Sequence, residues 1–355
     1  IEYGSLMNKH QLAIVPLLIS GLFITASANE ITLSKHIETV KLPEPIKRIA
    51  PKYPKKAARQ AREGWAKYSF IIEKDGSVSN VVVGETSGSD DMTRVGLRAI
   101  KQWKYEPAMK DGKPVQQCNN TIQLDFKIEN QYEKGVRKRF RSHYKKALAA
   151  IENNQFKEAN KNLDAIKKFK NTYIAEHNYY HLASLMLAEK QQDKQKQLHH
   201  IYQISHKGDY LNDELKLSLL LKKFTLEVDA NKFSNAFKTY KQLADNPMAK
   251  PHLAEYEKLV SKIKDHINQG ESVSINGKMR DQAFWTHSLI GNQFSLSDVE
   301  GQLTTLDVRC QNFRHKYTVE ENNTWTLPKE WENCRLFIYG EDNAKFTLHE
   351  QLAKS

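Results

Sequence analysis

The sequence predicts a multidomain α+β protein whose three regions follow one another along the chain. Residues 47–130 predict a small antiparallel sheet with two helices, because runs of period two flank a helical window. Residues 131–270 predict an all-α region, since helical periodicity dominates and glycine is rare. Residues 271–355 contain short β-prone runs separated by turn residues, which predict a small all-β domain of the sandwich type. At 355 residues the chain exceeds a single ordinary core.

Residues 1–28 have the pattern of a signal peptide with a short upstream extension. Lys9 supplies a positive charge, a 15-residue apolar stretch runs from Leu12 to Ala26, and the small residues ending at Ala28 fit a cleavage site. This stretch is shorter than the roughly 20 apolar residues that span a membrane. We therefore expect export and cleavage, with an uncleaved membrane anchor as the alternative. Residues 29–46 follow as a proline-containing linker.

A strand and a hairpin turn open the region after the linker. Apolar residues alternate with their neighbours over residues 66–73, which places four apolar side chains on one face of a strand. These four are Ala66, Tyr68, Phe70 and Ile72. The dipeptide Asp75-Gly76 then predicts a tight turn onto the valine-rich run 78–83.

A helix and a last strand complete this region. Asp90 and Asp91 suit the N-cap and first turn of a helix, and apolar residues recur at mostly helical spacing as far as Trp103. Residues 121–128 alternate strictly, which predicts a second half-buried strand. Its apolar face carries Ile122, Leu124, Phe126 and Ile128, and its opposite face carries Thr121, Gln123, Asp125 and Lys127.

In this order and spacing the elements resemble the C-terminal domain of TonB, the energy-transducing protein of Gram-negative envelopes. The match covers about 78 of the 355 residues. It departs from the family at Met92-Thr93, where Leu-Asp is usual, and at Gly96, where Ala is usual. The residues that carry the resemblance include Tyr53, Pro54, Gly64, Asp75, Gly76, Ser87, Gly88, Trp103 and Pro107.

The resemblance implies that an extended peptide from an outer-membrane receptor, or from another partner, adds a strand to the exposed edge of the sheet. The strand over residues 121–128 would be this docking edge, and Thr121, Gln123, Asp125 and Lys127 would be its outward-facing residues. The alternative is that the rest of the chain covers the edge. The long proline-rich spacer and polar anchor of TonB transducers have no counterpart here, so we expect a docking domain without the attachment to a motor complex.

Three windows of the helical region align with one another. They begin at Ala150, Met186 and Thr225, which are 36 and 39 residues apart. Asn154-Gln155-Phe156 in the first window corresponds to Asn231-Lys232-Phe233 in the third. The spacing is close to the 34-residue period of tetratricopeptide repeats, which the region resembles loosely. A plain helical bundle is the alternative.

The positive charge is concentrated in the helical region. The chain has a net charge of +12, and residues 131–270 hold 26 Lys and Arg against 16 Asp and Glu. A lysine-solvated helical surface accounts for this excess, and a patch for peptidoglycan or another anionic surface is the alternative. A nucleic-acid partner is not expected, because no motif interleaves aromatic residues with the charge.

The cysteines and histidines indicate structure rather than catalysis. Cys310 and Cys334 lie in strand-like runs of an exported chain and are expected to form a disulfide, whereas Cys118 is expected to be a free buried thiol. His199-His200 are adjacent on a helix and are expected at the surface, and His287 is expected in the core. Motifs for phosphate binding, hydrolysis or metal binding are missing from the sequence. We therefore expect no enzyme, no cofactor and no metal.

The sequence as a whole favours a periplasmic, non-enzymatic protein-interaction protein linked to TonB-dependent transport across the outer membrane. Two alternatives remain open. One is a transducer anchored in the inner membrane, and the other is an envelope scaffold that binds peptidoglycan or an anionic surface.

Overall fold

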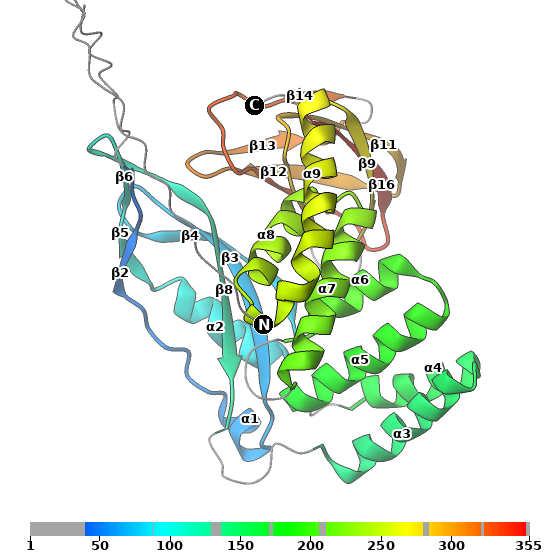
Figure 1. The fold of residues 1–355 in the computed structure, drawn as a ribbon. Helices are drawn as coiled ribbons and strands as arrows, with labels where there is room; N and C mark the ends of the chain where they lie inside the picture. The colour runs from blue at the N-terminus through cyan, green and yellow to red at the C-terminus, as the bar shows by residue number, and fades with distance from the viewer. Residues whose placement is uncertain are drawn as a thin grey trace, which may run out of the picture. The chain divides into compact units, whose positions relative to one another are not determined.

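The computed structural model describes residues 40–87, 89–128, 136–169, 173–205, 211–279, 284–320 and 323–352. The expected signal peptide and Gly88 lie outside these residues. Within the described ranges, no helix combines the length and the apolar character needed to cross a membrane. The order of the helices and strands can be followed in Figure 1.

The first region is built on a three-stranded antiparallel sheet. Strand β3 (Gly64–Ile72) lies in the centre, between β4 (Val78–Thr86) and β8 (Gln117–Phe126). Helix α2 (Asp90–Ile100) lies beside this sheet, and the short helix α1 (Lys55–Arg59) precedes it (Figure 1). The predicted apolar face is confirmed, because the four alternating residues of β3 share one buried cluster with Ile100, Trp103 and Tyr105.

The expectation that β3 is only half buried is wrong. Trp65 and Ile71, on the opposite face from the predicted stripe, are also buried. The indole of Trp65 packs edge-to-face on the ring of His177, with 5.5 Å between the ring centroids. Local alternation shows only the first covered face of a strand, and here residues remote in the sequence cover the second.

Trp103 does not end the helix as predicted. Helix α2 stops at Ile100, and the amides of Gln102 and Trp103 bond to carbonyls three residues back, which tightens the chain into a turn. Trp103 is nevertheless buried, and its indole packs on Phe70 with 6.0 Å between centroids. Phe126 of β8 belongs to a separate cluster with Ala57 and Met92.

The described part of the predicted linker, residues 40–46, contributes to two short strands. Strand β1 (Val40–Lys41) pairs with β6 (Ala108–Lys110), and β2 (Glu44–Lys47) pairs with β5 (Lys104–Glu106). The strand β7 (Lys113–Val115) extends the first of these pairs into a small sheet. Pro45 lies on the short strand β2, where a missing amide is tolerated, and Pro43 lies between β1 and β2.

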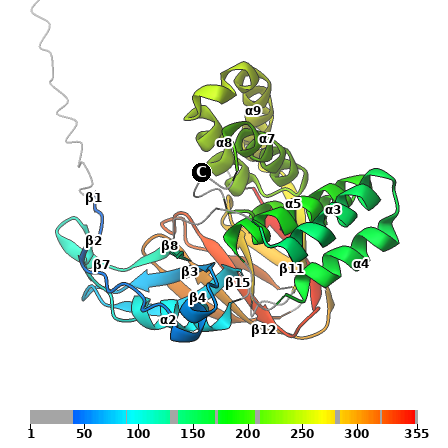
Figure 2. The ribbon, with the colours of Figure 1, turned by 90° about the horizontal axis from the view of Figure 1, so that it is seen from below.

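The helical region consists of three helical hairpins and a final helix, which Figure 2 shows from below. The hairpins are α3 (Lys138–Glu152) with α4 (Phe156–Lys167), α5 (Ile174–Lys190) with α6 (Lys194–Gln203), and α7 (Asp213–Asp229) with α8 (Phe233–Ala244). A 3-10 turn (Pro247–His252) leads into α9 (Leu253–Gln269).

The three hairpins share one turn geometry. Asn154, Gln192 and Asn231 occupy the left-handed region, with φ of 55°, 56° and 55°. In each turn the following amide donates to the carbonyl five residues back, at 2.8, 2.9 and 2.8 Å. This is the hydrogen bonding of a helix C-terminus closed by a left-handed residue. The turns make the hairpins geometrically equivalent, while their assignment to the tetratricopeptide family stays a prediction.

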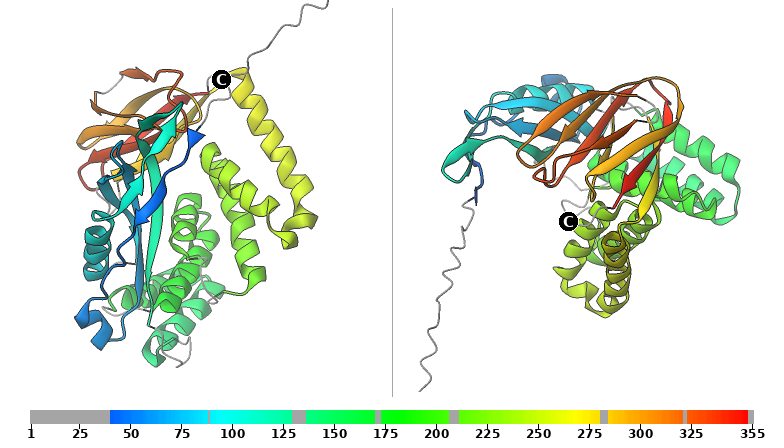
Figure 3. Two further views of the ribbon diagram at one scale, coloured as in Figure 1. Left: turned by 90° about the vertical axis from the view of Figure 1, so that its left-hand side faces the viewer. Right: turned by 90° about the horizontal axis from the view of Figure 1, so that it is seen from above.

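The C-terminal region is a sandwich of two four-stranded antiparallel sheets, whose strands can be followed in Figure 3. One sheet has the order β10 (Phe284–Ser288), β15 (Arg335–Gly340), β12 (Leu303–Arg309) and β13 (Arg314–Thr318). The other has the order β14 (Thr324–Thr326), β11 (Gln293–Glu300), β16 (Lys345–Gln351) and β9 (Ser272–Lys278). The predicted β-rich region is therefore all-β within its described residues.

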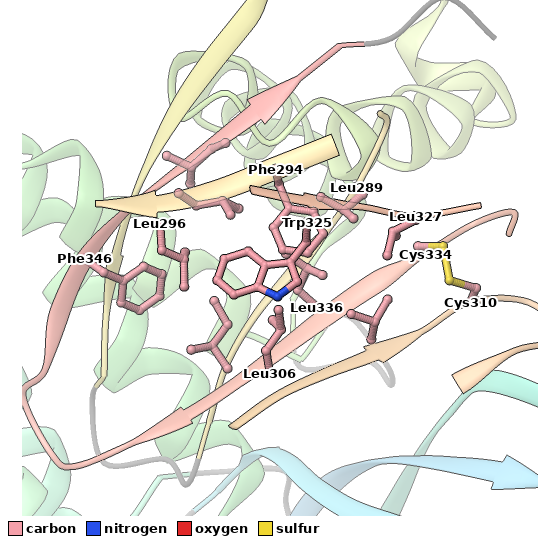
Figure 4. Close-up of a cluster of buried hydrophobic side chains, with 14 residues drawn as sticks. Leu289, Phe294, Leu296, Leu306, Cys310, Trp325, Leu327, Cys334, Leu336 and Phe346 are labelled. Carbon is pink, nitrogen blue, oxygen red and sulfur yellow. A yellow bond between two sulfur atoms is a disulfide. The ribbon is translucent and has the colours of Figure 1, made fainter. Parts of the chain in front are cut away.

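Large apolar side chains fill the space between the two sheets. Phe294 stacks on Trp325 with 5.5 Å between ring centroids, and Leu306 and Leu336 from the other sheet are fully buried beside them (Figure 4). The expected disulfide joins Cys310 to Cys334 at one end of this core, and Cys118 is free and buried.

Candidate docking edge

Strand β8 is one of the two edge strands of its sheet. Within the described strands it pairs with β3 alone, in a register that places Gln123 opposite Lys67 and Leu124 opposite Ala66. Its second long side is therefore available to an additional strand wherever other parts of the chain leave it open.

The hydrogen bonds of Trp65 establish which backbone groups of β8 point outward. The carbonyl of Trp65 accepts from the amide of Ser87 at 2.9 Å, and its amide donates to the Ser87 hydroxyl at 3.0 Å, so both groups point toward β4. Backbone groups alternate in an antiparallel ladder, so those of Ala66 point toward β8 and meet Leu124. The backbone groups that face away from β3 are therefore those of Thr121, Gln123 and Asp125.

The structure places the four sequence-predicted edge residues close together. Thr121, Gln123 and Asp125 lie in β8 on one face, and Lys127 follows one residue beyond its end. The Gln123 side chain donates to the Asp125 carboxylate at 2.6 Å. Among the residues that the structure describes, no group accepts a hydrogen bond from the outward amides of the three strand residues.

One end of this open stretch is closed by the C-terminal sandwich. The amide of Cys118 donates to the carbonyl of Gln311 at 3.0 Å, and the Asn119 side chain donates to the carbonyl of Asn333. At the other end the amide of Ile128 donates to the carboxylate of Glu63, which directly precedes β3, at 3.3 Å. The alternative of a covered edge thus holds at the Cys118 end of β8 and leaves its middle open.

Family-motif residues support the far end of β8. The ring of Tyr53 packs edge-to-face on Phe126, with 5.8 Å between centroids, and Pro54 is the N-cap of α1. A side chain at Gly64 would begin 2.6 Å from the Ser87 hydroxyl and 2.8 Å from the Met92 sulfur. A Cβ atom at this position would therefore require the side chains of Ser87 and Met92 to shift.

The turn between β3 and β4 is also built by motif residues. The Asp75 carboxylate accepts from the hydroxyl of Ser77 at 2.6 Å and from its amide at 2.8 Å, and this bonding lowers the pKa of Asp75. Gly76 has φ of +76°, and a Cβ there would lie 1.8 Å from the carbonyl oxygen of Tyr105 and 3.7 Å from Pro107. This turn therefore requires glycine for both its backbone angle and its packing.

One departure from the family pattern has a structural reason. A side chain on Gly96 would begin 2.1 Å from the hydroxyl of Tyr68. That hydroxyl instead donates to the Thr93 carbonyl at 2.9 Å, and burial raises the pKa of Tyr68 well above its usual range. Gly96 and Tyr68 thus fit each other, and an alanine at this position would require the tyrosine to move.

A histidine cluster was missed at the sequence level. His199 and His200 were expected at the surface, yet Nδ1 of His200 lies 3.0 Å from Nδ1 of His181 on α5. His177 lies one turn before His181, with 4.4 Å between the centroids of the two tilted rings, and burial lowers the pKa of His177 to about 4. The spacing of these two histidines on one helix face could have revealed the cluster. In the described part of the chain, no group of three or more metal-ligating side chains has an arrangement that could hold a metal ion.

Comparison with known proteins agrees with the geometry of this region. Residues 49–128 match the family described as Gram-negative bacterial TonB protein C-terminal. The chain is 32% identical over 81 residues to Protein TonB of Vibrio cholerae serotype O1, which covers 23% of this chain and 33% of that protein. It is 33% identical over 86 residues to Protein TonB of Pseudomonas aeruginosa, and this match covers 24% of this chain and 25% of that protein.

A solved structure is also similar to this region. The solution NMR structure of the Pseudomonas aeruginosa TonB CTD is 31% identical, with a TM-score of 0.23, and the match covers 25% of this chain and 89% of that one. The chain spans about a third of the length of the Vibrio cholerae relative. The shared part is thus the C-terminal domain of TonB, and the helical hairpins and the sandwich lie outside it.

Proposed function

We propose that this protein is a non-enzymatic interaction protein of the periplasm that docks an extended peptide along β8. The observation that supports the proposal is the outward row of backbone groups at Thr121, Gln123 and Asp125 in a domain of the TonB C-terminal family. Main-chain bonds to such an edge supply affinity, and side chains at alternate positions supply specificity. The partner would be an outer-membrane receptor or another component of TonB-dependent transport.

The outward groups of β8 indicate the length of the peptide. Gln311 occupies the position beside Cys118, so a docked strand begins to pair after this residue. The outward groups of Thr121, Gln123 and Asp125 span five residues, so a peptide of about five to seven residues would use all of them.

The helical hairpins form the second part of the proposal. Their equivalent turns support a short array of tetratricopeptide type, which would hold a second protein partner. At the start of this array the guanidinium of Arg139 lies 4.9 Å from the ring centroid of Phe169, and Lys161 and Lys168 line the same surface hollow. This basic hollow favours the envelope scaffold as a second candidate function, with an anionic polymer as its ligand.

Titration calorimetry of the whole protein against receptor-derived peptides tests the docking function. The isolated segment 47–130 is a poor substitute, because it loses β1 and β2 and exposes Trp65. Saturable binding of an extended peptide to the parent protein supports the proposal. If no such peptide binds, while soluble peptidoglycan fragments do, the scaffold function is favoured instead.

A further inference from the structure

A cavity of about 480 Å³ lies where the helical hairpins meet the sandwich. Its walls come from α6, from the turn between α7 and α8, and from β9, β10 and β15. This volume is in the range of small-molecule sites, which are typically about 300–1,000 Å³. The cavity has no part in the docking edge, since Thr121, Gln123 and Asp125 are not among its lining residues.

Lys232 enters this cavity from the turn of the third hairpin. The preceding residue, Asn231, fixes the turn, because its side chain donates to the carbonyl of Ser274 in β9 at 3.0 Å. Nζ of Lys232 lies 5.2 Å from the ring centroid of Trp285. In the part of the chain that the structure describes, no acceptor forms a hydrogen bond or ion pair with this ammonium group. Burial lowers the pKa of Lys232 to about 8, and the charge of Glu227 opposes this effect.

Trp285 is held as a fixed aromatic wall. Its ring lies nearly parallel to that of His287, with 5.9 Å between centroids, and edge-to-face on Phe346 at 5.1 Å. His287 is itself fixed, since its Nε2 lies 2.8 Å from the carboxylate of Glu350. A ligand would therefore meet a preorganised apolar surface beside the Lys232 ammonium group.

The charges that line the cavity do not balance. Arg335 is a second partly buried cation, whose Nε donates only to the Ser288 hydroxyl at 3.2 Å among the described residues, and burial lowers its pKa. The carboxylates in the wall already have cationic partners. Glu85 pairs with Lys67, and Asp229 pairs with Lys194 at 2.7 Å. The unpaired charge in the cavity is therefore positive.

We propose that this cavity binds a small organic anion, whose carboxylate or phosphate group is held by Lys232 and Arg335 and whose apolar part lies against Trp285. Both cations are partly buried, and beside the ring of Trp285 the ammonium group of Lys232 has lost part of its hydration without gaining a hydrogen-bond acceptor. A bound oxyanion supplies that acceptor through charge-assisted hydrogen bonds. The proposal is independent of the docking function, because it involves other residues and another class of ligand.

Titration calorimetry of the whole protein at low ionic strength tests the proposal, with succinate and citrate as carboxylate probes and glycerol 3-phosphate as the phosphate probe. We expect either the carboxylate probes or glycerol 3-phosphate to bind saturably. Inorganic phosphate should bind at least tenfold more weakly. Lys232→Gln and Arg335→Gln should each lower the affinity for the tighter-binding probe tenfold or more. Arg335→Lys should retain most of the parent affinity. Lys329→Gln, an equal charge change at an exposed position, is the matched control and should have no effect.

Three results would overturn the proposal. The first is that no probe binds saturably at millimolar concentration. The second is that Lys329→Gln lowers the affinity as much as the two cavity variants do. The third is that inorganic phosphate binds as tightly as the organic anions. Thermal melting without a ligand separates binding from folding. Lys232→Gln should melt at or above the temperature of the parent, because it removes a partly buried charge that has no hydrogen-bonding acceptor among the described residues. A large loss of stability would indicate a structural role for the lysine and would also count against the site.

Discussion

The main-chain amide of Cys118 donates a hydrogen bond of 3.0 Å to the carbonyl oxygen of Gln311, 193 residues later in the chain. Cys118 lies in β8, and Gln311 follows the last strand residue of β12 by two positions. The guanidinium of Arg309 adds a second link, because it donates to the carbonyl of Asn80 at 3.1 Å. The sandwich thus contributes one boundary of the docking edge, and this boundary has no counterpart in a TonB-type domain on its own.

The first prediction concerns the outward amides of β8. Gln123→Pro or Asp125→Pro should weaken binding of a receptor peptide tenfold or more, which is about 1.4 kcal/mol for each factor of ten. The proline removes a donor that faces the incoming strand and leaves the ladder with β3 intact. Titration calorimetry of the whole protein measures the change.

Two variants serve as controls for this prediction. Gln123→Ala keeps the amide and should bind nearly as well as the parent. Leu124→Pro removes an amide that faces β3, and should instead lower the melting temperature. Unchanged affinity in both outward proline variants would exclude the middle of β8 as the docking site.

The second prediction concerns the core beneath the sheet. Trp103→Ala should lower the free energy of unfolding by about 3 to 5 kcal/mol, because a large buried side chain is lost. Trp103→Phe keeps an aromatic ring against Phe70 but loses the indole bond to the carbonyl of Ile49 and part of the buried ring, so it should cost less than Trp103→Ala and about 1 kcal/mol or more. Urea unfolding measures both. A Trp103→Ala variant as stable as the parent would contradict the packing described above.

The third prediction is a loss of stability in mild acid. Burial holds the pKa of His177 at about 4, below its usual value of 6.5. Between pH 4 and pH 6.5 the imidazole of His177 is protonated in the unfolded chain and neutral in the folded chain. The free energy of unfolding should therefore fall from pH 6.5 toward pH 4, by at most about 1.4 kcal/mol for each pH unit.

His177→Gln isolates this contribution from the other titrating groups. Glutamine can still donate to the carbonyl of Gln203, as His177 Nε2 does at 3.1 Å, but it does not titrate. Urea unfolding at several pH values should give a flatter profile for the variant. Parallel profiles for the variant and the parent would mean that His177 titrates normally.

The fourth prediction concerns the cysteines. Mass spectrometry without a reductant should find Cys310 linked to Cys334 and Cys118 free. The Cys118 thiol should resist alkylation in the folded protein, because burial raises its pKa to about 12, and should react readily in urea. Reduction should lower stability by about 3 kcal/mol, since the bridge closes a loop between residues 24 apart. Rapid labelling of the native thiol would show that Cys118 is accessible.

The local patterns of the first region predict its strands because one face of each strand follows the alternation rule. The run from Ala66 to Ile72 and the glycine turn at Gly76 are examples, since both depend on neighbours within a few residues. The burial of Trp65 depends instead on His177, more than a hundred residues later. A contact between residues so far apart in the sequence cannot be predicted from a local pattern.

The cavity shows the same limit for a candidate site. Lys232, Trp285 and Arg335 belong to a helical turn and to two strands that are not consecutive in the chain. Each of them has an ordinary local context, a lysine in a turn or an aromatic residue in a strand. Only the packing of the third hairpin on the sandwich, fixed in part by Asn231, brings them to one cavity.

The strand order of the sandwich has a consequence for how the chain folds. Strand β16, whose last residue is Gln351, lies between β11 and β9, and β9 opens the domain near Ser272. The sheet therefore stays in two pieces until β16 has been synthesised. Contacts between segments so far apart in sequence are slow to form. A truncation before Lys345 would leave β9 without its neighbour, and nascent chains should acquire protease resistance in this domain only after Gln351 has emerged from the ribosome.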